Sequence, residues 1–358
     1  MNDALPLQGL LQSLGWAVLH SFWQMALVWL LYHLFFGWRS RLSPIVKHNA
    51  ALLLLSAGGV WFLITFVDQY RAFMQVERYL ALLPDAGQDP VNAAPAAALS
   101  LSEFMSVISG FTEKHIVYLS SIYLLVLGFM AWKLLYGFFQ ARLLRTRGLA
   151  QAGAALEEKV AALARRLSIS RPVRVFLSRM VDVPATLGFF KPVILLPLSS
   201  LTQLTPAQLE SILLHELAHI RRMDYLLNIW VSCMETMLYH NPFAWLLVRA
   251  VRRERELCCD DIVLSCRLDA VEYASALLSL EKSRSLPVLS MALASNGSKG
   301  QLLNRVRRMT SAPRVHMPYT DRLMALSLVC LLMISLTWLR PGTTQAHTRS
   351  NGMPIQLR

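Results

Sequence analysis

Two short pieces of the chain carry side chains that could bind a metal ion and hydrolyse a bond beside it. The first, His215-Glu216-Leu217-Ala218-His219, is an H-E-x-x-H motif. Residues four apart lie on one face of a helix, so His215 and His219 can offer both imidazoles to one ion. Glu216 lies one residue round the turn, near enough to reach a water at that ion. The motif predicts a zinc site with Glu216 as its general base.

The second piece supplies what the first lacks. A catalytic zinc site takes three protein ligands and keeps a fourth position open. Glu256, in Arg255-Glu256-Leu257-Cys258-Cys259-Asp260, offers the third ligand. Asp260 lies one helical turn further on and could accept the outer N–H of a ligating histidine. A thiolate from Cys258 or Cys259 is an alternative ligand, although buried cysteine more often packs as a small apolar residue.

The residues ahead of the motif predict the helix that must position it. Thr205, Pro206 and Gln208 form a capping-box pattern, with Thr205 as N-cap and Pro206 at the first helical position. Apolar residues then recur at helical spacing: Leu209, Ile212, Leu213, Leu217 and Ile220. The motif should therefore occupy the second and third turns of a well-started helix.

Short extended segments precede this helix. Residues 173–177 and 193–196 read as strands, and 184–190 as a third extended piece, after an amphipathic helix over 154–167. A strand beside the catalytic helix could hold an extended substrate by β-augmentation. The alternative is that these strands only brace the helix. Further on, we expect a helix over 270–282 and a loop over 285–300.

The composition indicates a membrane protein with one modest soluble domain. The 358 residues are 55% hydrophobic and 16% charged, with a mean hydropathy of +0.42. A soluble enzyme of this size carries about a quarter charged residues. The formal charge of +13 comes from Lys and Arg that flank apolar runs, so no direct nucleic-acid partner is expected. Five cysteines without a C-x-x-C pair fit a reducing compartment.

Four apolar segments predict membrane spans, and the basic residues beside them predict an outside N-terminus and a cytoplasmic catalytic domain. The apolar segments are Leu14–Phe36, Ala50–Val67, Val117–Phe139 and Leu323–Leu339. We expect two transmembrane helices with a basic cytoplasmic loop over 1–67, an extracytoplasmic loop over 68–115 and a third span over 116–139. A cytoplasmic zinc metallopeptidase domain follows over 140–322. The chain then continues with a fourth span over 323–339 and a short extracytoplasmic tail over 340–358.

Three other features of the sequence bear on packing. Gly58-Gly59 offers a close helix contact in the second span. Residues 225–248 read as two helices broken near Asn241-Pro242, and a hairpin that dips into the bilayer is the alternative. The arginines at 305, 307, 308 and 314 mark the cytoplasmic end of a span, or contact a partner or anionic lipid.

At this point the sequence resembles a known family. The stretches concerned are His215 to Asp224, His240-Asn241-Pro242, Arg255 to Asp260 and residues 183–197. Together they look like the BlaR/MecR-type membrane zinc metallopeptidases. These gluzincins relay an antibiotic signal across bacterial membranes. The resemblance implies a zinc endopeptidase of the bacterial inner membrane and makes His240 and Asn241 candidates for oxyanion or substrate contacts.

The resemblance weakens at the C-terminus. Receptors of that family carry a penicillin-binding sensor domain there, whereas the stretch after Pro341 is short and polar and holds no S-x-x-K or K-T-G sensor motif. We therefore expect the peptidase without that sensor.

The resulting prediction is a mainly α, multi-pass membrane protein with four transmembrane helices and an α+β gluzincin metallopeptidase domain between the third and fourth. Three functions stay open: a regulatory protease that cleaves a cytoplasmic protein such as a transcriptional repressor, a quality-control protease of HtpX-like type, and a non-catalytic scaffold with structural zinc. The intact Glu216 argues against the scaffold. Expected partners are a protein substrate and membrane lipid, and a homodimer is left open.

Overall fold

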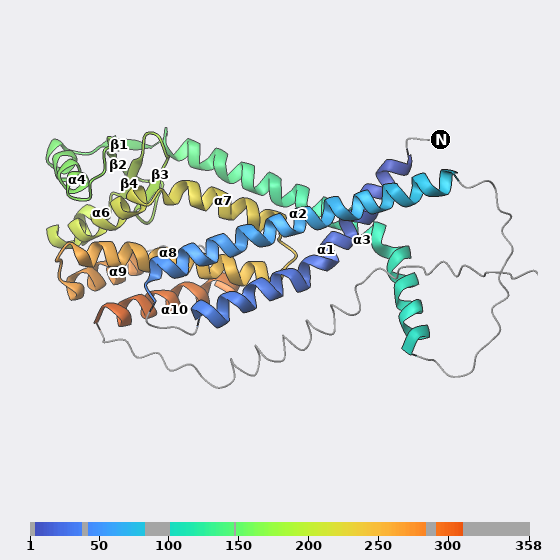
Figure 1. Cartoon of the computed structure of the whole chain (residues 1–358). Coiled ribbons are helices and arrows are strands. Elements are labelled where there is room, and N and C mark those ends of the chain that lie inside the picture. The colour runs from blue at the N-terminus through green and yellow to red at the C-terminus, as the bar shows by residue number, and fades with distance from the viewer. Residues whose placement is uncertain (1–3, 38–41, 83–100, 147, 284–290, 311–358) are drawn as a thin grey trace, which may run out of the picture.

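The computed structural model describes residues 4–37, 42–82, 101–146, 148–283 and 291–310. Three long helices run side by side, and a small sheet with shorter helices lies at one end of them (Figure 1). The long helices are α1 (Ala4–Tyr32), which a π-helical turn over His33–Gly37 continues, α2 (Pro44–Leu82) and α3 (Leu101–Leu144). The fold is thus mainly helical, as predicted.

Each of these helices contains a segment that could cross a membrane. Within the described residues, three segments are long and apolar enough: Pro6–Gly37, Pro44–Tyr79 and His115–Leu144. Helices α2 and α3 also extend into the segment 68–115, which we expected to be a loop and which is helical at both ends. The expected fourth span at 323–339 and the tail at 340–358 lie outside the described residues.

A four-stranded sheet covers the catalytic helix. The strands β1 (Leu149–Gln151), β2 (Arg174–Ser178), β3 (Ala185–Leu187) and β4 (Val193–Pro197) lie in the order β1-β2-β4-β3. Strands β2 and β4 are parallel, and the other two pairs are antiparallel. The three predicted extended segments correspond to β2, β3 and β4, and β3 forms an edge of the sheet.

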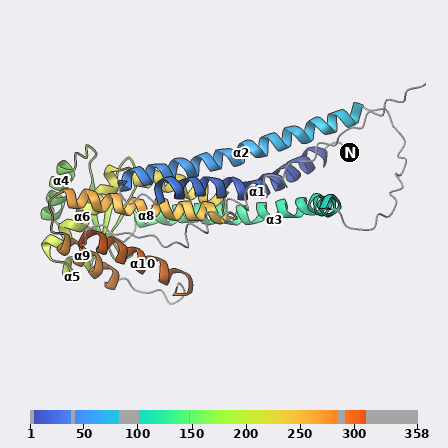
Figure 2. The ribbon, with the colours of Figure 1, turned by 60° about the horizontal axis from the view of Figure 1, so that its bottom comes forward.

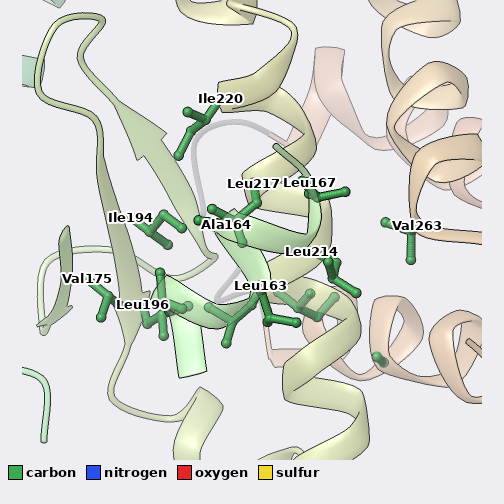
Figure 3. Packing of buried hydrophobic residues seen from close by; sticks show 14 of the residues in the cluster. Leu163, Ala164, Leu167, Val175, Ile194, Leu196, Leu214, Leu217, Ile220 and Val263 are labelled. Carbon is green, nitrogen blue, oxygen red and sulfur yellow. The ribbon is translucent and has the colours of Figure 1, made fainter. Parts of the chain in front are cut away.

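The core of this end lies between the sheet and two helices, α4 (Ala154–Arg166) and α6 (Pro206–Arg221). Ile194 and Leu196 of β4 point toward Leu163 of α4 and toward Leu214 and Leu217 of α6 (Figure 3). Every residue of β4 is buried, as expected of a central strand covered on both faces. Burial of such side chains stabilises the fold by about 1.5–3 kcal/mol each and fixes one face of α6.

The N-terminus of α6 forms as predicted, after a short helix α5 (Ser200–Gln203). The Thr205 hydroxyl accepts a hydrogen bond from the Gln208 backbone N–H (3.2 Å), and the Gln208 side chain accepts one from the Thr205 N–H (3.1 Å). This capping box satisfies two N–H groups that a helix start leaves unpaired.

Helices α7 (Asp224–Met237) and α8 (Pro242–Ser265) form a hairpin whose tip lies among the long helices. The break comes at the predicted Asn241, whose side chain caps α8 through the Phe243 N–H (3.0 Å) and donates to the Ser21 carbonyl (2.9 Å). The neighbouring His240 ring contacts Phe22, Phe62 and Tyr123, one from each long helix. Figure 2 shows α8 running beside α1 and α2. The segment therefore forms two helices broken near Asn241-Pro242, as predicted.

Helices α9 (Ala270–Ser283) and α10 (Met291–Thr310) complete the described fold. The predicted helix at 270–282 is confirmed. The loop expected over 285–300 is wrong for 291–300, which belongs to α10. The run Ser295-Asn296-Gly297-Ser298 has low helix propensity, which explains why the sequence predicted a loop there.

Glycines set how closely the long helices approach. A Cβ on Gly58 would meet the Met25 side chain of α1, and one on Gly59 would meet Met234 of α7, as the predicted close contact requires. Gly15 of α1 lies against α3, where a Cβ would come within 2.9 Å of the Ile116 carbonyl oxygen. This contact holds the first part of α3 to α1.

We expect Gly15→Val to destabilise the protein by about 1–3 kcal/mol, since the added carbons would overlap the α3 backbone. Gly128→Val is the matched control, because Gly128 lies on α3 and a Cβ there meets nothing within 4 Å. Thermal unfolding in one detergent would compare the two variants with wild type. Equal melting temperatures for both variants would contradict this contact.

Candidate metal centre

Two imidazoles and a carboxylate meet where α6 and α8 lie side by side. The Nε2 atoms of His215 and His219 are 3.2 Å apart, and His215 Nε2 is 3.6 Å from Glu256 Oε2. All three ligand atoms lie within 4.8 Å of one another. Ligands of a tetrahedral zinc with bonds of about 2.0–2.1 Å are about 3.3 Å apart, so this donor set fits such an ion.

His219 is oriented from behind by Asp224, at the start of α7. The ring Nδ1–H donates to Asp224 Oδ2 at 2.7 Å, which leaves Nε2 free to face the other ligand groups. Arg222 Nε donates to the second oxygen of Asp224 at 3.3 Å. Burial raises the pKa of Asp224, but His219 and Arg222 lower it by more, so the carboxylate stays charged.

His215 is oriented through a tyrosine. Its Nδ1 lies 2.9 Å from the Tyr273 hydroxyl, which donates to Asp260 Oδ1 at 2.7 Å. The ring N–H therefore points to Tyr273, and Nε2 faces Glu256. Burial and the Asp260 charge hold the pKa of Tyr273 well above its usual value, so the phenol keeps its proton. Asp260 itself is 3.5 Å from the ring, so it acts on His215 mainly through Tyr273.

Arginines hold the carboxylates in place. Arg305 of α10 donates from Nε and Nη2 to the two oxygens of Asp260, at 2.8 and 2.7 Å, and its Nη1 lies 3.5 Å from Glu256. Arg255 donates to the other Glu256 oxygen at 3.1 Å. Burial raises the pKa of Glu256, but the nearby His215, His219 and Arg255 hold it well below its ordinary value. Glu256 is thus ionised, as a metal ligand must be.

Glu216 faces the sheet edge next to the cluster. Its Oε2 accepts a hydrogen bond from the Thr186 hydroxyl of β3 at 2.7 Å. Glu216 and the three cluster residues line one cavity of about 990 Å³, which β3 also borders. The carboxylate that sequence reasoning made the general base therefore lies in the same open space as the cluster.

The two cysteines lie behind the cluster. Cys259 is fully buried, with its sulfur 3.4 Å from His219 Nδ1 and 3.5 Å from Asp224, on the side of the ring away from Nε2. Burial raises the pKa of Cys258 to about 12 and also raises that of Cys259, so both stay thiols. His219, Asp224 and Cys259 form a second group of side chains close enough to bind one ion. Such an ion would need the Nδ1 of His219, and that nitrogen already donates a hydrogen bond to Asp224.

The structure does not bring His240 and Asn241 to this centre. The His240 Nε2 lies 2.8 Å from the Ser21 hydroxyl, and Asn241 binds the same residue of α1. They lie at the hairpin tip, some 15 residues before Glu256 along α8, and so serve helix packing and capping. Asp261, by contrast, is exposed and pairs with Arg308 at 2.9 Å, as expected for a solvated helix face.

Comparison with known proteins identifies the family of the chain. A family model described as BlaR1 peptidase M56 matches residues 87–309, more than half of the chain. The chain belongs to this family. The family is described as one of peptidases, and three of the described helices of this chain are long and apolar enough to cross a membrane.

Individual M56 relatives are similar over limited segments. The regulatory protein BlaR1 of Bacillus licheniformis is 33% identical over 93 residues, which are 25% of this chain and 15% of that protein. The methicillin resistance mecR1 protein of Staphylococcus aureus (strain Mu50) is 21% identical over 165 residues, 45% of this chain and 28% of the relative. The chain thus spans less than a third of the length of these relatives.

The cluster predicts a metal content that depends on three side chains. Purified wild type should hold about one zinc per chain, whereas His215→Ala, His219→Ala and Glu256→Ala should each lose most of it, because two ligands hold zinc poorly. Elemental analysis after dialysis would measure this content. His240→Ala is the control, and loss of zinc there but not in the cluster variants would contradict the assignment.

The carboxylates that hold the outer nitrogens of the two histidine rings should affect the affinity for zinc. Asp224→Asn and Asp260→Asn should each weaken zinc binding about 10–100-fold, because the first holds His219 and the second holds His215 through Tyr273. Competition with a chelator would give the affinities. Asp261→Asn, one residue from Asp260 but exposed, should match wild type. An equal loss in all three would point to a general charge effect.

Proposed function

We propose that this protein is a membrane-bound, zinc-dependent endopeptidase that hydrolyses a peptide bond of a cytoplasmic protein. The observation that carries the proposal is the placement of Glu216 and the ligand groups His215, His219 and Glu256 in one cavity bordered by an edge strand. In this proposal residues 140–322 form the catalytic domain on the cytoplasmic side, with the α7–α8 hairpin inserted among the spans.

The residues of the chain divide the chemistry among them. Zinc bound by His215, His219 and Glu256 would polarise the scissile carbonyl and lower the pKa of water to about 7. Glu216 takes the proton from the attacking water and delivers it to the leaving amine. Thr186 donates to Oε2 of Glu216 and so orients the carboxylate without neutralising it. A scaffold with structural zinc would have no use for this carboxylate.

The edge strand β3 gives the substrate a place to bind. Its partner β4 lies on one side only, so the other side of β3 offers backbone N–H and C=O groups to an extended peptide. Residues 183–189 line the cavity beside Glu216. We infer that the substrate backbone pairs with β3 and passes its scissile bond over the cluster, so the strand does more than brace α6.

A regulatory role fits the relatives, one of which bears the name regulatory protein. We propose that the target is a cytoplasmic regulator such as a transcriptional repressor. A quality-control protease is the second candidate, and one observation favours it: the cavity extends from the cluster along α3, within a candidate span. Membrane proteins could reach the centre by that path.

Glu216→Gln should keep about one zinc per chain and lower peptide cleavage at least about 100-fold, because the amide cannot accept the proton of water. Cells that express this variant would be compared with wild type by mass spectrometry of accumulated proteins and of cleavage products. One accumulated soluble regulator would support regulation, and many membrane proteins would support quality control. Wild-type cleavage by the variant would reject the peptidase mechanism.

A further inference from the structure

The cavity at the metal centre continues away from it between α3 and α7. On α3 the lining residues recur at helical spacing: Met130, Lys133, Leu134, Gly137, Phe138 and Ala141. On α7 they do the same: Tyr225, Asn228, Ile229, Ser232, Glu235 and Thr236. Each set is a single face of its helix. We call the space between these two faces the α3–α7 cleft.

The α3–α7 cleft lies beside a membrane span. Its α3 wall, residues 130–141, belongs to the second half of the candidate span His115–Leu144. The first half of that span is held to α1, where the Ser120 hydroxyl donates to the Leu11 carbonyl at 2.5 Å. The α7 wall belongs to the hairpin whose tip contacts the middle of the spans. The cleft therefore leads from the metal centre along the second half of this candidate span.

The two walls differ in chemistry. The α3 wall is apolar except for Lys133. The α7 wall presents Asn228, Ser232 and Thr236 one helical turn apart. Within the described part of the chain, neither the Ser232 nor the Thr236 hydroxyl has a hydrogen-bond partner. An extended peptide suits such walls, since its backbone needs hydrogen bonds where water is scarce and its side chains need apolar contact.

We propose that the α3–α7 cleft binds an extended apolar segment of the substrate next to the scissile bond. The preferred substrate is then a protein in which a membrane-inserted segment adjoins a cytoplasmic cleavage site, so the cleft favours the second candidate above, a membrane protein, over a soluble repressor. This inference rests on the proposed peptidase function and names its substrate class. Met130 to Ala141 span about 16 Å of helix, which corresponds to about five extended residues. Their backbone would meet Ser232 and Thr236, and their side chains would meet α3.

Two glycines of α3 allow a matched test. A Cβ on Gly137 meets nothing within 4 Å, and Gly137 faces the α3–α7 cleft. A Cβ on Gly128 also meets nothing within 4 Å, but Gly128 is not among the lining residues. Both positions can accept a large side chain, and Gly137→Trp alone would place an indole in the cleft.

The experiment measures binding of inhibitors to the zinc-loaded full chain in lipid nanodiscs. The probes are peptides in which a phosphinic group replaces the scissile peptide bond. Two apolar probes carry six leucine and valine residues, one on the N-terminal side of the phosphinic group and the other on its C-terminal side. Each has a counterpart with six serines at the same positions. We expect one apolar probe to bind at least about tenfold more tightly than its serine counterpart, because apolar side chains leave water. Gly137→Trp should abolish this difference, and Gly128→Trp should keep it.

Loss of serine-probe binding by Gly137→Trp would show that this variant misfolds. A second variant then tests the cleft independently. Ser232→Ala combined with Thr236→Val removes both hydroxyls at nearly constant volume and should weaken the apolar probe about tenfold. Equal binding of apolar and serine probes to wild type would overturn the cleft assignment and leave the peptidase function standing. A lipid acyl chain found in the cleft would have the same two consequences. Absence of all binding to the zinc-loaded protein would overturn both.

Discussion

Each histidine of the cluster is held at its outer nitrogen, and this constraint makes the rest of the site work. His219 donates to Asp224, and His215 donates to Tyr273, so both Nε2 lone pairs face the same point as Glu256. Without these bonds the rings could rotate, and the two Nε2 atoms would not be held toward one point. The site is thus set by hydrogen bonds to residues of three further elements, α7, α8 and α9.

These outer groups also connect the centre to the whole catalytic end. Asp260 receives Tyr273 from α9 and Arg305 from α10, so one buried carboxylate of α8 links three helices. The Arg305 guanidinium offsets the negative charges of Asp260 and Glu256, which would otherwise repel each other one turn apart on α8. Burial strengthens the attraction between Arg305 and these carboxylates. The strong pairing of Arg305 with Asp260 gives α10 a fixed position next to the cluster.

Local patterns in the sequence were enough to predict the elements that carry the ligands. Glu256 was predicted from the residues next to it, and the capping box at Thr205 and the spacing of His215 and His219 depend on residues close in the chain. The outer partners do not. Asp224 reaches His219 only because Met223 adopts a left-handed turn (φ 59°), and Arg305 lies 45 residues from Asp260. Likewise, the family resemblance suggested His240 and Asn241, but the hairpin carries them to α1. Tertiary packing decides such pairings, and no short-range pattern encodes them.

The fastening of α8 to α1 has a mechanical consequence. Asn241 both starts α8 and binds the Ser21 backbone of the first span, while Glu256 lies 15 residues further along the same unbroken helix. That length is about 22 Å, so a tilt of about 3° at the anchored end would displace the far carboxylate by about 1 Å. Such a displacement is enough to change catalytic rates about 100-fold. Helix α8 therefore couples the position of α1 to that of Glu256, so a small movement of α1 would shift the carboxylate relative to His215 and His219.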